Sequence, residues 1–143
     1  MTGTIFQGHI HQNLEEIDAS YNEIARISAK TFEGLDRLTR INLDDNLITH
    51  IEKGAFVDLS SLKYIGLRGN KISHIDDEAF QTIHQLQELD LAFNRLTHFD
   101  FAMFDQVYCL KAVAGKDRES VPLHFCYYLV LFPRWLDRLG PLK

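Results

Sequence analysis

Three histidines recur at one fixed spacing along the chain. His50, His74 and His98 are separated by 24 residues each, and Arg26 stands one interval earlier. Imidazole nitrogens bind metal ions and change charge near neutral pH, so neighbouring histidines could form a metal site or a pH sensor. Ligating rings usually have a carboxylate that orients them, and we identify no acidic residue recurring with this column. The favoured interpretation is an exposed polar position, with no metal and no cofactor.

Two acidic clusters could also carry chemistry. Asp44 and Asp45 form one, and Asp76, Asp77 and Glu78 form the other. Both fall where turns are expected and neither has the glycine-containing loop of a calcium site, so we interpret them as solvated surface. The sequence also has no GxSxG, GxxxxGK[ST] or HExxH motif. No catalytic residue is predicted, and the chain is not expected to be an enzyme.

Composition limits the class of protein. The chain has 143 residues, of which 45% are hydrophobic and 24% charged, enough for one domain with a continuous core. The net charge of −5 argues against a nucleic-acid partner. Cys109 and Cys126 are the two cysteines, which leaves both their pairing and the redox compartment open. We find no signal-like start, and the apolar run at 125–132 is too short to insert into a membrane.

The elements that position these residues come from an internal repeat. The stretch "LQELDLAFNRL" from Leu86 has counterparts in "LEEIDASYNEI", "LTRINLDDNLI" and "LKYIGLRGNKI", each 24 residues apart. Two further columns keep the same spacing without any insertion: Asn22, Asn46, Asn70 and Asn94, and Phe32, Phe56, Phe80 and Phe104. A fixed period of this length indicates a repeat protein.

Each repeat predicts one strand and one change of direction. Apolar residues alternate at 16–20, 40–44, 64–68 and 88–92, which predicts short strands that stack in parallel around a shared core. The asparagine side chain can donate to and accept from the backbone where the chain leaves the strand, so the column predicts a ladder. The phenylalanines are expected to fill the far side of each turn.

The ends of the chain depart from this pattern. Residues 1–13 look like part of a repeat, four full repeats occupy 14–109, and 110–143 hold a degenerate repeat and a tail that could fold back as a cap. A shortened or alternatively ended product of a longer repeat gene would explain both ends.

The motif LxxLxLxxNxL resembles the signature of leucine-rich repeat proteins across residues 14–109. The 24-residue turn with a phenylalanine is similar to the typical extracellular class, and residues 91–107 resemble the chaoptin-like cell-surface adhesion proteins of arthropods. The resemblance implies an α/β fold: a leucine-rich repeat solenoid forming a curved horseshoe fragment. It places a parallel β-sheet on the concave face and irregular turns with short helical segments on the convex face.

The concave face of such a solenoid is the expected binding surface. Eight outward positions are the candidate partner-binding residues: Tyr21, Arg40, Asn42, Asp44, Tyr64, Arg68, Asp90 and Phe93. Arginine and aromatic residues at the centre are the types that anchor protein interfaces. The alternative is that the sheet only needs soluble side chains, with opposite charges paired across strands.

Two functions remain open from the sequence. The first is a non-catalytic protein–protein binding module of a cell-surface adhesion or receptor protein. Its partner would be a protein, including another leucine-rich repeat chain in a homophilic contact. The second is an intracellular leucine-rich repeat scaffold or regulatory subunit. The first places the chain outside the cell as part of a longer protein, whereas the lack of a signal in these residues is compatible with the cytoplasm.

Overall fold

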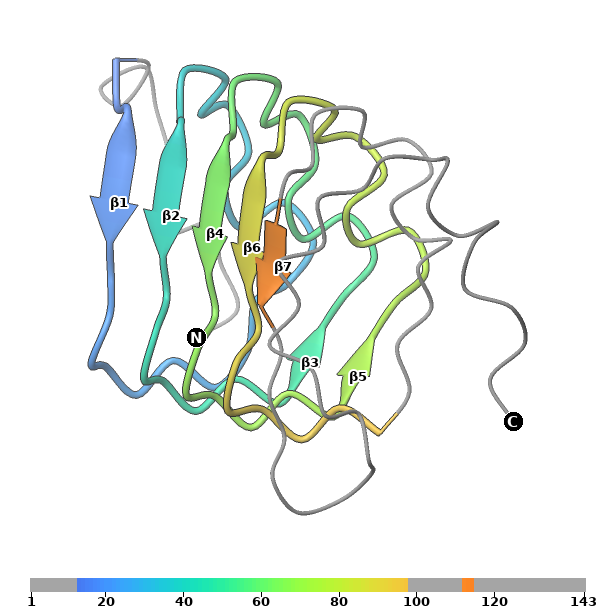
Figure 1. Ribbon diagram of the computed structural model, residues 1–143. Coiled ribbons are helices and arrows are strands. Elements are labelled where there is room, and N and C mark those ends of the chain that lie inside the picture. Colours follow the sequence, from blue (N-terminus) through green and yellow to red (C-terminus); the bar gives the residue numbers. More distant parts are fainter. Residues whose placement is uncertain (1–12, 98–111, 115–143) are drawn as a thin grey trace.

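The computed structural model describes residues 13–97 and the strand at residues 112–114. Five short strands form one parallel sheet in the order β1-β2-β4-β6-β7 (Figure 1). They are β1 (Glu16–Asp18), β2 (Arg40–Asn42), β4 (Tyr64–Gly66), β6 (Glu88–Asp90) and β7 (Ala112–Ala114). The predicted tail, His98, Phe104 and both cysteines lie outside the described residues. The predicted domain boundary near residue 109 therefore stays a prediction.

The register of the sheet follows the sequence repeat. Ile17 lies beside Ile41, Ile41 beside Ile65, and Ile65 beside Leu89, so each residue faces the one 24 positions further on. Leu89 then lies beside Val113, which extends the same register into the degenerate repeat. The predicted parallel arrangement is confirmed, although each strand has three residues, fewer than the predicted five.

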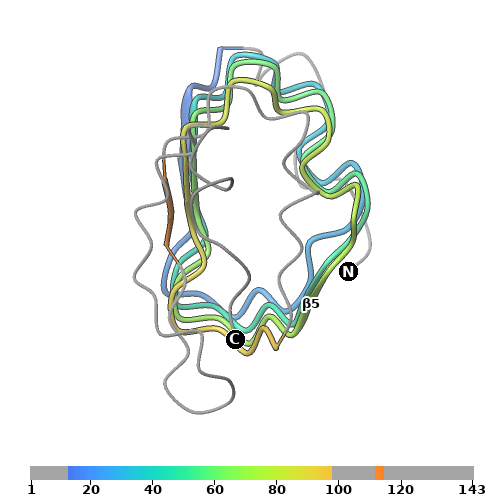
Figure 2. The ribbon, with the colours of Figure 1, turned by 45° about the vertical axis from the view of Figure 1, so that its right-hand side comes forward.

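The core lies inside the stacked turns. Viewed along the stack, the turns nearly superimpose around a common interior, with the sheet on one long side (Figure 2). Leucine and isoleucine side chains such as Leu38, Ile65 and Leu86 are fully buried there. On the far side the ring of Phe56 stacks between Phe32 and Phe80, at centroid distances of 5.8 and 5.7 Å. The described part of the phenylalanine column has its predicted core role.

The predicted asparagine ladder is also present. Asn70 Nδ2 donates to the Leu43 carbonyl of the preceding repeat at 2.9 Å and to the Leu67 carbonyl of its own repeat at 3.1 Å. Its Oδ1 accepts from the Ile48 backbone N–H at 3.0 Å. Asn46 and Asn94 make the same bonds one repeat away and are buried like Asn70. The amide thus closes each strand exit and ties consecutive repeats together.

The side opposite the sheet is built from turns. In residues 13–97 the expected short helical segments do not occur, and turns take their place. A second, unpredicted parallel ladder lies there: β3 (His50–Ile51) pairs with β5 (His74–Ile75), and Ile27 bridges to Ile51. Figure 2 shows β5 across the turn from the five-stranded sheet. Among the described residues, no helix has the length and apolarity to cross a membrane.

Candidate functional site on the concave face

The eight candidate residues all lie on the strands of the main sheet or just after them, and we call them the concave patch. Arg40 and Asn42 belong to β2, Tyr64 to β4 and Asp90 to β6. The other four follow the ends of β1, β2, β4 and β6: Tyr21, Asp44, Arg68 and Phe93. The stacking of repeats therefore brings residues 72 positions apart onto one face, as the sequence pattern predicts.

Two arginines of the patch stack on aromatic rings of the next repeat. The guanidinium carbon of Arg40 lies 3.6 Å from the centroid of the Tyr64 ring, and that of Arg68 lies 4.4 Å from the Phe93 ring. Cation–π contacts of this kind stabilise exposed pairs by ~0.5–1 kcal/mol and hold the side chains in place. Both arginines of the patch therefore contact aromatic rings. A sheet face that serves solubility alone would instead be expected to pair opposite charges across its strands.

The aromatic residues at the strand exits occupy an unfavourable backbone conformation. Tyr21, Asp45, Gly69 and Phe93 hold the same place in consecutive repeats, with φ angles of 54°, 52°, 67° and 57°. Glycine adopts this left-handed conformation freely and aspartate tolerates it, but it is rare for a bulky side chain. The side chains of Tyr21 and Phe93 are also 81% and 49% exposed, so core packing does not account for them.

Replacing Tyr21 by glycine is expected to raise the free energy of unfolding by ~1 kcal/mol. The change removes left-handed strain at a ring that is 81% exposed, and so loses little packing. Urea denaturation measures the effect. The matched control is Gly69→Ala, which places a Cβ in the same conformation and close to the Asp45 carboxylate, and should be destabilising. A loss of stability in both variants would contradict the strain argument.

A glycine in the third repeat makes room for the oxygen atoms at the centre of the patch. In the other repeats Asp18, Asn42 and Asp90 each accept from the backbone N–H two residues later. Gly66 has no side chain to do this, and Asp44 Oδ1 accepts from the Arg68 N–H instead, at 2.9 Å. A Cβ at residue 66 would lie 2.7 Å from Asp44 Oδ1, 2.9 Å from Asn42 Oδ1 and 3.1 Å from the Tyr64 hydroxyl.

This crowding changes the acidity of two groups. Burial is the main cause that raises the pKa of the Asp44 carboxyl above 3.8; the hydrogen bond from Arg68 N–H opposes the shift, and the Asp90 and Asp45 carboxylates add to it. Burial likewise raises the pKa of the Tyr64 hydroxyl, and the Asp44 carboxylate adds to that shift. The ionised Asp44 carboxylate at the centre of the patch is therefore less favourable than one in water. A cation from a partner placed beside it would offset this unfavourable free energy.

Asp44→Asn is expected to make the protein more stable than the wild type at neutral pH. Because its folded pKa is raised, the Asp44 carboxyl contributes stability that is present below about pH 3.8 and is lost as the pH rises through the folded pKa. Asparagine keeps an oxygen for the Arg68 N–H but does not ionise. The stability difference from wild type, measured by urea denaturation between about pH 3 and pH 8, should appear only above about pH 4.

The exposed neighbour Asp45 offers the control for this prediction. Asp45→Asn changes the net charge of the protein equally but leaves the carboxylate next to Gly66 in place. A pH-dependent gain that is the same in both variants would show that overall charge, and not the site of Asp44, is responsible.

The histidine column differs from its predicted role. His50 and His74 face each other in the β3–β5 ladder, with ring centroids 5.0 Å apart. The expectation that no carboxylate accompanies them is wrong: Asp76 Oδ1 lies 2.9 Å from His50 Nε2 and 3.2 Å from His74 Nε2. The contact with His50 is the main cause that lowers the pKa of Asp76 below 3.8. We call His50, His74 and Asp76 the histidine edge.

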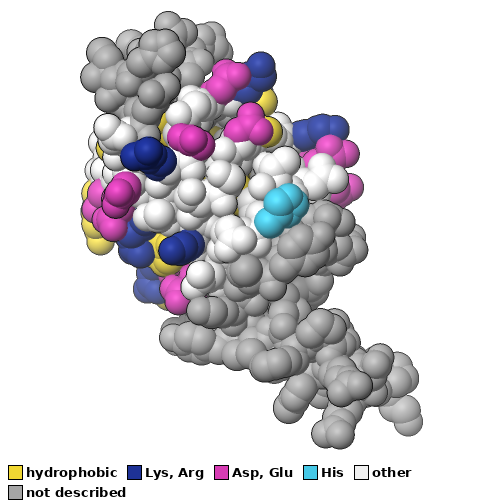
Figure 3. Space-filling model, turned by 90° about the horizontal axis from the view of Figure 1, so that it is seen from above, with side chains coloured by type: hydrophobic (Ala, Val, Ile, Leu, Met, Phe, Trp, Pro, Cys, Tyr) yellow, Lys and Arg dark blue, Asp and Glu magenta, His cyan; other side chains and the backbone are white. Residues whose placement is uncertain are grey.

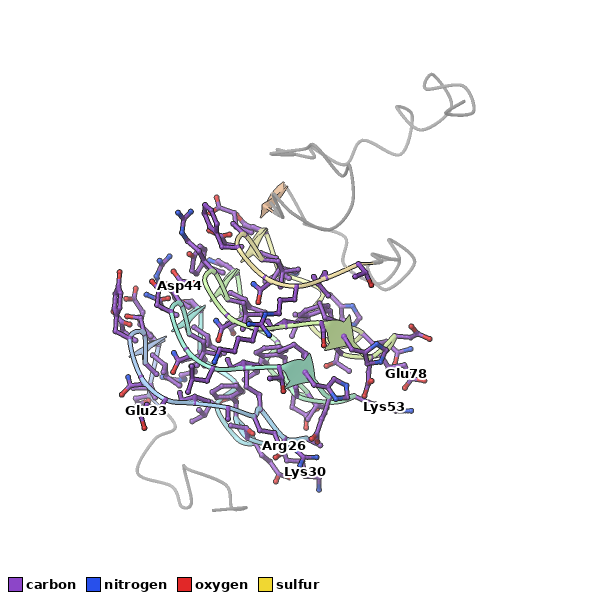
Figure 4. All side chains as sticks on the ribbon, turned by 90° about the horizontal axis from the view of Figure 1, so that it is seen from below. Glu23, Arg26, Lys30, Asp44, Lys53 and Glu78 are labelled. Atoms are coloured by element: carbon purple, nitrogen blue, oxygen red, sulfur yellow. The ribbon has the colours of Figure 1, made fainter. Side chains whose placement is uncertain are left out.

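The sequence did contain a signal for this contact. Glu52, Asp76 and Asp100 recur with the 24-residue period, two positions after each histidine. Asp100 lies outside the described residues, but the other two acidic side chains each contact the basic residue of the preceding repeat: Glu52 pairs with Arg26, and Asp76 pairs with His50. Figure 4 shows Arg26, Lys53 and Glu78 across the stack from Asp44, so the histidine edge and the concave patch are separate surfaces.

The described surface carries charge of both signs. From above, the acidic and basic side chains lie interspersed over the stack (Figure 3). On the concave face, Arg40 and Arg68 are flanked by Glu16 and Asp18 on one side and by Glu88 on the other. A surface of mixed charge suits recognition by complementary patches on a partner.

Comparisons with known proteins agree with this architecture. A family model described as "Leucine rich repeat" matches residues 12–72 and 60–112. Among solved structures, a chain of the TLR13–ssRNA13 complex is similar with a TM-score of 0.68 and 25% identity, over 71% of this chain and 14% of that one. A chain of the Toll–Spatzle complex, described as a molecular hub in Drosophila development and innate immunity, gives a TM-score of 0.68 and 21% identity.

The Toll–Spatzle alignment covers 76% of this chain and 14% of the other, so this chain spans 14% of the length of both solved relatives. No curated protein matches the sequence. The similarity to the Toll–Spatzle chain, at 21% identity, indicates a shared fold only. The family match covers more than half of the chain and coincides with the stacked parallel strands, the asparagine ladder and the phenylalanine column. This chain belongs to the leucine-rich repeat family.

Proposed function

We propose that this chain is a non-catalytic protein-binding module of a cell-surface adhesion or receptor protein, and that it binds through the concave patch. Leucine-rich repeat domains are typically protein–protein interaction modules, and one solved relative is a complex of Toll with a protein, Spatzle. The resemblance of residues 91–107 to chaoptin-like adhesion proteins supports the adhesion role.

The observation that supports this proposal most directly is a pair of exposed aromatic residues, Tyr21 and Phe93, whose backbone conformation is left-handed. A face that needed only solubility would place glycine or aspartate at this position, as the second and third repeats do with Asp45 and Gly69. The first and fourth repeats place Tyr21 and Phe93 there, and Arg68 stacks on Phe93. Strained residues that packing does not explain are common at functional sites, and aromatic residues and arginine are the usual anchors of interfaces.

The patch also suggests the chemistry of its partner. The Asp44 carboxylate beside Gly66 is partly buried and close enough to Asp90 for their charges to interact unfavourably. A lysine or arginine of the partner would relieve this repulsion, while apolar groups would cover Phe93 and the Tyr64 ring. We therefore propose a protein surface with a basic side chain at its centre.

The size of the patch limits the affinity of this chain alone. Five strands at ~4.8 Å spacing span about 20–25 Å, which gives a surface of several hundred square ångströms. Stable complexes usually bury ~800 Å² on each partner. Tight binding would therefore require further repeats or a second copy of this chain in a homophilic contact.

Photo-crosslinking in cells that express the protein tests the binding face. A photoreactive phenylalanine analogue replaces Phe93 and, as the control, Ser60, which is exposed on the turn side of the same stack and does not have a left-handed backbone. The expected result is a protein adduct from residue 93 that the additional changes Tyr64→Ala and Arg68→Ala abolish. Adducts from residue 60 only would place binding on another face. Adducts from residue 93 that survive both changes would show that Tyr64 and Arg68 do not contribute to binding.

Sedimentation over a range of concentrations tests the homophilic form of this proposal. The wild type should self-associate weakly, and the variant with both Tyr64→Ala and Arg68→Ala should remain monomeric. A wild type that stays monomeric at the highest concentration would favour a different partner protein, which the crosslinking experiment identifies.

The second candidate function is an intracellular leucine-rich repeat scaffold or regulatory subunit, which would use the same fold in a reducing compartment. The state of Cys109 and Cys126 discriminates between the two. A disulfide between them in protein from the native source, found by mass spectrometry without reduction, would favour export, and two free thiols would favour the cytosol.

We do not propose a nucleic acid as the partner of this chain. One solved relative is a complex with ssRNA, but the net charge of this chain is −5 and its arginines on the concave face stack on aromatic rings beside carboxylates. Phosphate contacts require accessible basic side chains and make binding strongly dependent on salt. Salt-sensitive binding of a single-stranded RNA at the concave patch would overturn this part of the proposal.

A further inference from the structure

The histidine edge has a geometry that the concave patch does not require. The β3–β5 ladder sets His50 beside His74, and their rings are tilted by 58° to one another. Both Nε2 atoms lie within 3.2 Å of one oxygen, Asp76 Oδ1. Each of the three side chains offers one ligand atom, and these atoms all lie within 4.8 Å of one another.

We propose that His50, His74 and Asp76 form a binding site for a single zinc ion on the edge opposite the concave sheet. Two imidazole nitrogens and one carboxylate oxygen form a typical zinc donor set, and they leave a fourth position open to water. Calcium and magnesium prefer sites made of oxygen atoms alone, so this set favours a transition metal.

Two of the three separations between ligand atoms are close to those around a tetrahedral ion. Zinc–ligand bonds of ~2.0–2.1 Å place neighbouring ligand atoms about 3.3–3.4 Å apart. The observed separations between Asp76 Oδ1 and the two nitrogens are 2.9 and 3.2 Å. Outward shifts of a few tenths of an ångström, within the reach of side-chain rotations, would bring both separations to the tetrahedral value, and all three ligand atoms lie within 4.8 Å of one another.

The carboxylate is already oriented for this role. Asp76 Oδ2 accepts a hydrogen bond from the backbone N–H of Lys53 at 2.8 Å, which leaves Oδ1 directed to the histidines. The Lys53 ammonium group forms an ion pair with Glu78 (both labelled in Figure 4). Partners that fix a ligating group strengthen metal binding, and their loss typically weakens it by ~10–100-fold.

The site is also accessible from solvent. The side chains of His50, His74 and Asp76 are 41%, 66% and 32% exposed. An ion bound there would join the second repeat, which carries His50, to the third, which carries the other two ligands. Zinc would therefore cross-link the two repeats. It would do so beside the β3–β5 ladder, in which each strand has only two residues.

The competing explanation is a simple ion pair. One repeat earlier, Arg26 and Glu52 occupy the equivalent positions and form such a pair, although arginine is not a metal ligand. An ion pair alone needs only one histidine per carboxylate, whereas here two nitrogens share one oxygen. Direct measurement of zinc binding separates the two explanations.

The test is calorimetric titration of the full chain with zinc chloride. His50→Gln, His74→Gln and Asp76→Asn should each weaken one zinc site by ~10-fold or more, or abolish it. Asp77→Asn and His84→Gln are the matched controls, because each makes the same chemical change outside the three ligand positions, and both should bind as the wild type does. Circular dichroism checks that every variant is folded.

NMR of the histidine side chains of the wild-type protein gives a second readout that does not depend on the variants folding. Zinc should shift the ring nitrogens of His50 and His74 together, with saturation at one ion for this pair. Ring resonances of His50 and His74 that do not respond to zinc would overturn the proposal. So would equal affinity in the ligand and control variants, and the edge would then hold ion pairs only.

Discussion

Asn70→Ala is expected to lower the free energy of unfolding by ~2–4 kcal/mol. Asn70 is 5% exposed, and its side chain satisfies the Ile48 N–H and the carbonyl groups of Leu43 and Leu67. Alanine leaves these buried backbone groups without that partner, and each unsatisfied group costs ~1–3 kcal/mol. Urea denaturation of the purified chain measures the loss.

The same column offers a matched control for this prediction. Asn22 is exposed, and its Nδ2 donates to the carbonyls of Ala19 and Ser20 within its own repeat. Asn22→Ala should therefore cost less than ~1 kcal/mol, because water can replace the lost bonds. Equal losses in the two variants would mean that the ladder does not stabilise the stack through burial.

Phe56→Ala is expected to lower the free energy of unfolding by ~3–5 kcal/mol, a larger loss than that expected for Asn70→Ala. The Phe56 side chain is fully buried and stacks on a ring at each face, so alanine leaves a cavity in the middle of the column. The surrounding turns are fixed by the repeats on both sides and can relax only partly. The loss is measured by urea denaturation and by the midpoint of thermal unfolding.

Phe32→Ala is the control for the column. Its ring is also buried but stacks on Phe56 alone among the described residues. The first repeat is also more exposed, since Leu14 and Ile17 are only partly buried, so its turn can close over a smaller residue. The expected loss is smaller than for Phe56→Ala. A loss as large at Phe32 would show that the stacking partner on the second face contributes little.

The fold could be predicted from the sequence because its signals are local and repeated. One 24-residue unit specifies a short strand, an asparagine at its exit and a phenylalanine on the far side. Four copies without insertion leave parallel stacking as the arrangement that buries every apolar column. The strands proved shorter than predicted, because the side chains of Asp18, Asn42 and Asp90 at the strand ends accept the backbone N–H two residues later. The far side formed turns in place of short helices.

The candidate binding face could be located from the sequence, but its contacts could not. Alternation predicts which side chains leave the strands outward, and so identifies Arg40 and Tyr64 as neighbours. It does not reveal that the Tyr21 and Phe93 backbones are left-handed, because this depends on how the strand exit meets the next repeat. It also misses the role of Gly66, since the Asp44 carboxylate reaches residue 68 from a different repeat.

The sequence by itself determined the period, the parallel register and the buried asparagine and phenylalanine columns, because each follows from residue type at a fixed position of the repeat. Only the tertiary structure decided which polar groups meet between repeats. His50 and Asp76 are 26 positions apart and come within 2.9 Å because adjacent turns stack at the spacing of neighbouring strands. That distance depends on the packing of two turns together, which the pattern within one repeat does not encode.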